Sequence, residues 1–139
     1  MPQVSTVSEL NKQKLRLFVD AVLNAGQLEL IDELIAADYL GHLHCCTPVV
    51  VIGRDGVRLL VSSNRRTHPD VQFTIADLIA EDDRVAVRWR TSAPPPGIQS
   101  TKDQCALCWQ GLTIIRFLAG RQVDSHTECA NSPKRKRGS

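Results

Sequence analysis

Three side chains that can transfer protons alternate near the C-terminal end of the sequence: Asp124, His126 and Glu128. If this segment is a strand, the three share one face, because successive strand side chains point to opposite sides of a sheet. A carboxylate beside an imidazole orients it, so the pair can act as a general base or acid near neutral pH. We therefore predict that Asp124, His126 and Glu128 form a catalytic group on one face of this strand. Solvated side chains on an edge strand, or an interface, would produce the same pattern.

A second polar group lies near the middle of the N-terminal half, at Tyr39, His42 and His44. Tyr39 could donate a hydrogen bond to a developing enolate oxygen, and His42 could be a second proton carrier. His44 is predicted to contact substrate. A capping tyrosine followed by loop histidines is the alternative interpretation.

Two of the six aromatic residues are tryptophans, Trp89 and Trp109. They are predicted to line an apolar cavity suited to a flat ligand, although plain core packing explains them equally well.

The cysteines do not favour a metal centre. Cys105 and Cys108 form a CxxC motif, but no second CxxC pair exists and the motif lies in a predicted strand. We predict no metal and no cofactor. The count of five cysteines is odd, and no secretory signal is visible, so free thiols in a reducing compartment are expected.

Charge is concentrated at one end of the chain. The net charge is +2, and residues 134–137 contribute four positive charges, so the rest is mildly acidic. A domain that binds nucleic acid usually carries its own basic patch, and a membrane span needs about 20 apolar residues. We expect neither nucleic-acid nor membrane binding. A cytoplasmic location is expected, although the basic run leaves nuclear import open.

The periodicity of apolar residues changes from helical to alternating along the chain. Three helices are expected first, and a run of strands follows, which is typical of an α+β domain. Residues 1–130 are predicted to form one α+β domain, with the N-terminal helices packed on a curved antiparallel sheet, and 131–139 a disordered basic tail. The expected helices span 8–25, 28–39 and 53–66; the strands lie at 71–75, 85–89, 105–118 and 122–129; and a proline-rich loop spans 93–104.

Four stretches in this order resemble the SnoaL-like polyketide cyclases of the nuclear transport factor 2-like superfamily, over about residues 10–129. They are DYLGH at 38–42, GVRLL at 56–60, HPDVQFTIADLIAEDDRVAVRW at 68–89 and IIRFLAGRQVDSH at 114–126. The resemblance implies a cone-shaped α+β barrel with a blind pocket, into which the shared face of Asp124, His126 and Glu128 looks. It also implies a cofactor-independent cyclase, isomerase or dehydratase. Its substrate would be a polyketide-like or other apolar oxygenated molecule.

Two positions in or next to the last predicted strand differ from the family pattern. His126 and Ala130 stand where family cyclases have a tryptophan and, four residues later, a catalytic aspartate. A non-catalytic small-molecule-binding or protein-assembly module of the same fold therefore stays open as an alternative.

A homodimer is the last expectation. Both faces of the strand at 105–118 are largely apolar, which is typical of a sheet that is buried on two sides. The helices can cover only one face, so a second copy is predicted to cover the outer face.

Overall fold

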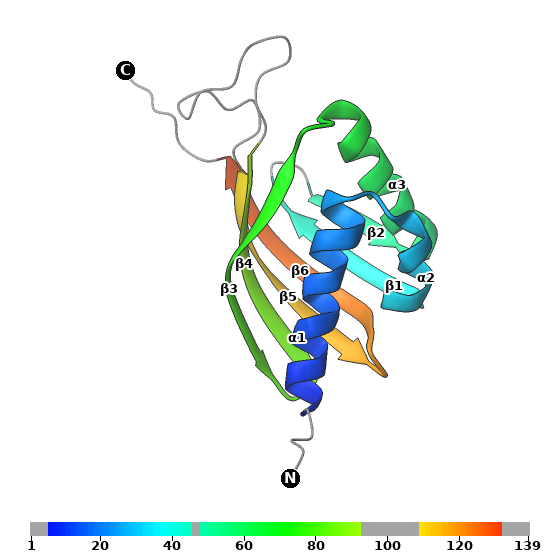
Figure 1. Ribbon diagram of the computed structural model, residues 1–139, viewed down its shortest axis with the longest axis vertical. Coiled ribbons are helices and arrows are strands. Elements are labelled where there is room, and N and C mark those ends of the chain that lie inside the picture. Colours follow the sequence, from blue (N-terminus) through cyan, green and yellow to red (C-terminus); the bar gives the residue numbers. More distant parts are fainter. Residues whose placement is uncertain (1–5, 46–47, 93–108, 132–139) are drawn as a thin grey trace.

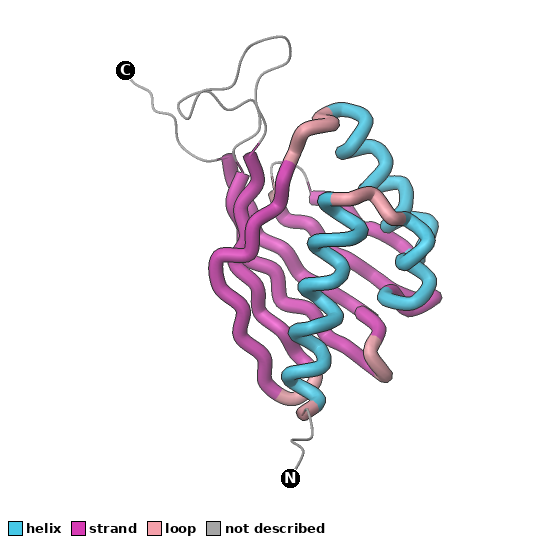
Figure 2. Tube along the Cα trace, viewed as in Figure 1, coloured by secondary structure: helices cyan, strands magenta, loops and turns pink. Residues whose placement is uncertain are grey.

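The computed structural model describes residues 6–45, 48–92 and 109–131. The helices form one layer and a strongly curved six-stranded sheet forms the other, so that the sheet wraps around the first helix (Figure 1). Figure 2 shows that all helical turns lie on the concave side of the sheet. The expected cone-shaped α+β fold is confirmed.

The N-terminal helical segment begins with α1 (Val7–Leu17) and continues as the π-helical turn η1 (Phe18–Asn24). Thr6 caps its first turn by accepting a hydrogen bond from the Glu9 backbone N–H at 3.1 Å. The segment ends where expected, because Gly26 adopts a φ of 75°, which favours glycine.

The second helical segment is shorter than predicted. It consists of the 3-10 turn η2 (Leu28–Leu30) and α2 (Ile31–Leu34), and strand β1 (Ile35–His44) starts at once. Strand β2 (Pro48–Ile52) pairs antiparallel with β1. Residues 35–39, which were predicted as the end of the second helix, are therefore part of β1, so Tyr39, His42 and His44 all lie on a strand.

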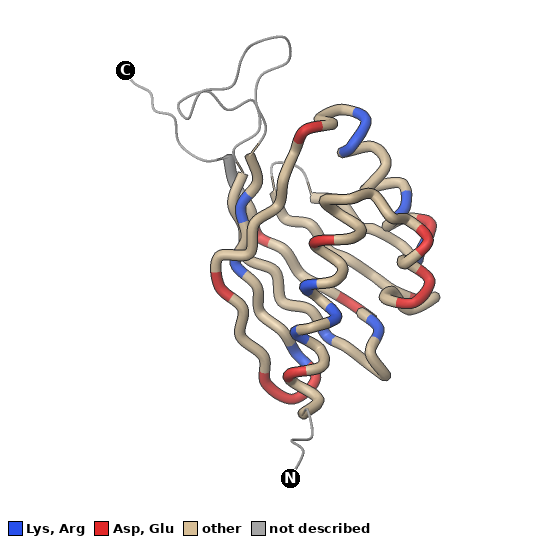
Figure 3. Tube along the Cα trace, viewed as in Figure 1, with Lys and Arg blue, Asp and Glu red and all other residues tan. Residues whose placement is uncertain are grey.

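Helix α3 (Gly53–Thr67) matches its prediction, and its buried side chains Val57 and Val61 face the sheet. Arg58 of this helix pairs with Asp55 at 2.8 Å and also with Asp32 of α2. Figure 3 shows acidic residues of α2 beside basic residues of α3. These exposed pairs help to fix the two helices together, although each contributes little to stability.

Four strands complete the sheet: β3 (Gln72–Glu81), β4 (Arg84–Ser92), β5 (Trp109–Leu118) and β6 (Arg121–Asn131). The strand order is β2-β1-β6-β5-β4-β3. All neighbours pair antiparallel except β1 and β6, which pair parallel, so the sheet is mixed and not purely antiparallel as predicted. The proline-rich loop, the CxxC motif and the basic run lie outside the described residues.

A β-bulge in β6 decides which side chains enter the molecule. Gln122 pairs with Phe117, but the next aligned pair is Asp124 with Arg116, so β6 carries one extra residue at this point. An extra residue inverts the alternation of side chains beyond it. Without the bulge, Asp124 would pair with the buried Ile115, and it would face inward.

Two apolar clusters frame the interior. One joins α3 and α2 to β1 and β2, and the other joins α1 to β4 and β5. Phe18 and Leu23 contact both clusters. Among the described residues, no helix is both long and apolar enough to span a bilayer.

Candidate functional site

A cavity of about 560 Å³ lies between the helices and the concave face of the sheet. Its wall is mainly apolar and is formed by α1, α3 and the inner side chains of all six strands. None of the described lining residues is Asp, Glu, Lys or Arg. A dry wall of this kind with a few polar groups is typical of a small-molecule site.

Inward-facing polar side chains follow β6 along the floor of the cavity. Gln122, Ser125 and Thr127 are each at most 5% exposed, and they line the cavity together with Cys129. The Gln122 Nε2 is the one buried side-chain nitrogen or oxygen of the described part of the chain that has no hydrogen-bond partner. Gln122 precedes the bulge, and Ser125 and Thr127 follow it. The extra residue is the reason why the inward positions change from even to odd numbers along β6.

The same bulge turns Asp124, His126 and Glu128 to the outer face, so the prediction that they face the pocket is wrong. His126 and Glu128 are exposed. Asp124 accepts a hydrogen bond from Arg116 Nε at 2.9 Å and lines a separate, charged hollow of about 470 Å³ on the outside of the sheet. The three side chains do share a face, as expected, but they do not line the cavity.

His42 and His44 also lie outside the cavity. Their strand, β1, pairs in register with β6, which places His42 beside His126 and His44 beside Glu128. The rings of His42 and His126 stack with their centroids 4.6 Å apart. Neither histidine can reach a ligand in the cavity from this face. No group of three or more metal-binding side chains is present within residues 6–45, 48–92 and 109–131.

Tyr39 is the predicted site residue that the structure places deepest in the cavity wall. It is 8% exposed, and its hydroxyl lies 2.6 Å from the Ser125 Oγ. Its ring fits against β1 because position 41 is glycine: a Cβ there would lie 2.6 Å from the Tyr39 hydroxyl oxygen. Burial raises the pKa of Tyr39 above 10.0, so its hydroxyl keeps its proton and remains a donor.

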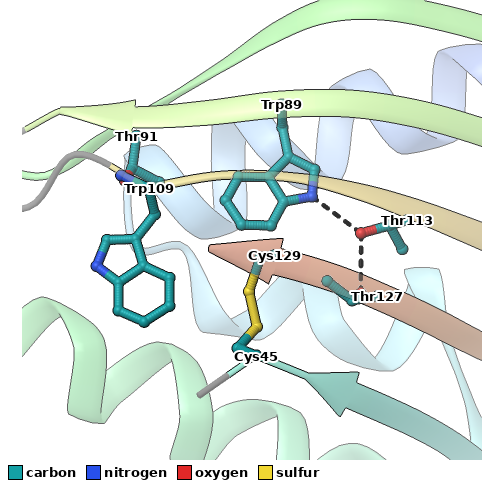
Figure 4. Close-up of a disulfide and its surroundings, with 7 residues drawn as sticks. All are labelled: Cys45, Trp89, Thr91, Trp109, Thr113, Thr127 and Cys129. Atoms are coloured by element: carbon teal, nitrogen blue, oxygen red, sulfur yellow. Dashed lines mark hydrogen bonds between the residues drawn. A yellow bond between two sulfur atoms is a disulfide. The ribbon is translucent and has the colours of Figure 1, made fainter. Parts of the chain in front are cut away.

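Trp89 forms a second polar contact inside the cavity. Its Nε1 donates to the Thr113 Oγ1 at 2.9 Å, and the Thr113 Oγ1 lies 2.8 Å from the Thr127 Oγ1 (Figure 4). The indole lies across β5 because residue 111 is glycine, where a Cβ would come within 2.5 Å of the Trp89 ring. Trp89 is thus both a wall of the cavity and a hydrogen-bond donor.

A disulfide between Cys45 and Cys129 lines the cavity (Figure 4). Trp109 lies beside it, and the Trp109 backbone N–H donates to the Thr91 Oγ1 at 3.1 Å. The prediction of free thiols is therefore wrong for these two cysteines. They are adjacent in space because β1 and β6 pair in register up to the preceding residues, His44 and Glu128.

His68 follows α3 and is the one imidazole among the described lining residues. In the sequence it was noted only as the first residue of the stretch 68–89 that resembles the family. Ser125, Thr113, Thr127 and Gln122 were missed as well. Ser125 and Thr127 do alternate along β6, but the bulge hid that they face inward in place of Asp124, His126 and Glu128.

Comparison with known structures places this architecture among the nuclear transport factor 2-like cones. IdmH from Streptomyces antibioticus is 24% identical, with 86% of this chain and 91% of that chain aligned and a TM-score of 0.69. Bal32a from a soil-derived mobile gene cassette is 18% identical, with coverages of 89% and 92% and a TM-score of 0.73. A Kribbella flavida protein named provisionally as a ketosteroid isomerase is 19% identical, with coverages of 96% and 87% and a TM-score of 0.70.

The sequence profile of the SnoaL-like polyketide cyclases matches residues 13–132. The chain therefore belongs to the SnoaL-like polyketide cyclase family. No curated protein sequence matches it.

Proposed function

We propose that this chain is a cofactor-independent cyclase or isomerase that binds an apolar, oxygenated small molecule in the interior cavity. The observation that carries the proposal is the buried pair of Tyr39 and Ser125 in a wall otherwise made mostly of apolar side chains. A neutral phenol in such a place can hydrogen-bond a ligand carbonyl and stabilise the negative charge that forms there on enolisation. Family membership supports the same reaction class.

The proton at the carbon next to that carbonyl needs an acceptor. The carboxylates that we predicted for this role face outward, whereas His68 lines the cavity. An imidazole can take up and return a proton near neutral pH. In the proposed reaction, His68 removes the proton, either directly or through a water molecule, and Tyr39 donates a hydrogen bond to the developing enolate oxygen. The proton then returns to a carbon of the enolate, and the choice of that carbon determines the product.

The proposal is tested with a model ketone, 2-tetralone, in D₂O. Exchange of its acidic C–H protons for deuterium is followed by proton NMR, with and without protein. Wild type should accelerate the exchange, and Tyr39→Phe should reduce the acceleration by about 100-fold, the typical effect of removing one oxyanion donor. Ser125→Ala should have a smaller effect, because it leaves the phenol in place. Equal rates for wild type and Tyr39→Phe would exclude the assigned role.

A non-catalytic binding module is a second candidate, favoured by one observation: no carboxylate is found among the described lining residues. Such a module would bind 2-tetralone with the same cavity contacts but leave its exchange rate at the buffer value. Measuring binding and exchange on one sample therefore separates the two candidates.

A further inference from the structure

A second polar cluster lies in the cavity besides the pair of Tyr39 and Ser125. Trp89, Thr113 and Thr127 come from the neighbouring strands β4, β5 and β6, and all three line the cavity. Figure 4 shows them in a row, with the indole N–H directed at Thr113 and Thr113 next to Thr127. We term this row the threonine cluster.

Counting protons shows that the threonine cluster has a donor to spare. An indole N–H only donates, and each threonine hydroxyl carries one proton. The cluster therefore holds three donor protons but only two internal contacts. Within the described part of the chain these three side chains make no other hydrogen bond, so one hydroxyl proton has no acceptor among the described residues. Because Thr127 is only 5% exposed, leaving that donor unpaired is costly.

The pair of Tyr39 and Ser125 gives the same count. Two hydroxyl protons share one contact, so one proton remains available there too. Ser125 and Thr127 are two residues apart on the inner face of β6, which separates their Cα atoms by about 6.6 Å. Each of the two clusters thus offers one hydrogen-bond donor, at two levels of β6, in addition to the Gln122 Nε2, which has no partner among the described residues.

The wall also restricts the charge of a ligand. Its described residues include no acidic or basic side chain apart from the imidazole of His68. An ionised ligand group at the level of Ser125 or Thr127 would be buried with hydroxyls but without a counter-charge, which is strongly unfavourable.

We propose that the cavity selects an uncharged ligand with two acceptor oxygens, one bound by Tyr39 and Ser125 and the other by the threonine cluster. The proposal rests on the proposed function in one respect: both require a small molecule inside the cavity. Trp89 is a positioning residue in this scheme, because its N–H occupies a lone pair of Thr113 and directs the hydroxyl protons toward Thr127 and the ligand.

The test uses four benzenes of similar shape that differ in their para substituents. They are para-diacetylbenzene with two acceptor oxygens, para-ethylacetophenone with one, para-diethylbenzene with none, and para-acetylbenzoate with a negative charge. Each is titrated into the full chain labelled with ¹⁵N, and dissociation constants are taken from amide and indole chemical shifts. Each acceptor oxygen should tighten binding by about 3- to 10-fold, and the benzoate should bind at least about 10-fold more weakly than the diketone.

Thr113→Val combined with Thr127→Val removes the threonine cluster with little change in volume. This variant should bind the diketone no better than wild type binds the monoketone. Thr74→Val, an exposed threonine of β3, is the matched control and should leave all four constants unchanged. The Trp89 indole N–H resonance should shift on diketone binding in wild type only.

Two results would overturn the inference in different ways. If the diketone, the monoketone and the hydrocarbon bind equally well, or if the benzoate binds as tightly as the diketone, the two-acceptor selection is wrong while the cavity remains a binding site. If none of the four shifts any resonance of a cavity residue, both the inference and the proposed function fail.

Discussion

Replacing Gly111 by alanine should destabilise the protein, although β-strand preference alone predicts the opposite. Glycine in a strand interior costs about 0.5 to 1 kcal/mol relative to alanine. At residue 111, however, a Cβ would lie 2.5 Å from the Trp89 ring and 2.8 Å from the Cys129 Cβ. The indole is held by Thr113 and by packing on Phe73, and Cys129 is fixed by its disulfide, so neither can move away freely.

The clash should outweigh the strand preference. Overpacking of this kind costs about 1 to 3 kcal/mol, and losing the Trp89–Thr113 hydrogen bond adds about 1 kcal/mol. We therefore expect Gly111→Ala to lower the free energy of unfolding by about 1 to 3 kcal/mol, measured by urea denaturation with fluorescence detection. The Trp89 indole N–H resonance should shift in the same variant.

The same substitution in a protein that lacks the Trp89 ring tests whether the clash with the indole is the cause. In a Trp89→Leu protein the ring is absent, so the cost of Gly111→Ala should shrink by at least about 1 kcal/mol, and the difference is the coupling of the two positions. If Gly111→Ala stabilises the wild-type protein, or costs the same in both backgrounds, the indole does not lie across residue 111.

Three further predictions concern the phenol, the disulfide and the outer face. Tyr39 is the single tyrosine of the chain, so the ultraviolet absorbance of tyrosinate should titrate above pH 10.0 in the folded protein and near 10.0 in denaturant. Because the unfolded chain loses this proton first, the free energy of unfolding should fall as the pH rises past 10.0. A folded midpoint at or below 10.0 would contradict the burial of the Tyr39 hydroxyl. The disulfide joins residues 84 apart in the sequence, and the loop-entropy model gives a stabilisation of about 4 to 5 kcal/mol for such a loop. Cys45→Ala combined with Cys129→Ala should therefore lower the urea midpoint of unfolding markedly. An unchanged midpoint would show that the bond is absent in solution. We also propose that two chains form a homodimer through the outer sheet face, where Ile114 is 45% exposed. Light scattering at low micromolar concentration should give twice the chain mass, and Ile114→Glu should give monomer or aggregate. A single-chain mass for wild type would refute the dimer.

Much of the fold could be predicted from the sequence because its signals are local. The amphipathic pattern of α3, the glycine that ends the first helical segment and the β3–β4 hairpin each depend on a few neighbouring residues. The first part of strand β1 was predicted as helix because its inward residues include Tyr39 and Gly41, which break the apolar alternation of a strand. That irregularity exists because the Tyr39 ring needs the space above Gly41.

The site was predictable only in part. Trp89 and Trp109 line the cavity as expected, because large aromatic side chains on strands usually point to the interior, and Tyr39 lines it as well. The roles of the three residues toward a ligand stay predictions. The predicted roles of Asp124 and His126 depended on which alternate side chains of β6 face the interior. A one-residue bulge inverts that alternation, and no local sequence signal marks it. The disulfide was missed for a similar reason, since it depends on a parallel pairing between strands far apart in the sequence.

The central claim is that ligands bind inside the cone and not on the outer histidine face. Isotope-filtered nuclear Overhauser spectroscopy of labelled protein with unlabelled para-diacetylbenzene tests it most directly. We predict contacts from the acetyl methyl protons to the Tyr39 ring, the Thr127 methyl group and the Trp89 indole, all of which belong to cavity-lining residues. Contacts to His42 and His126 in their place would contradict the account.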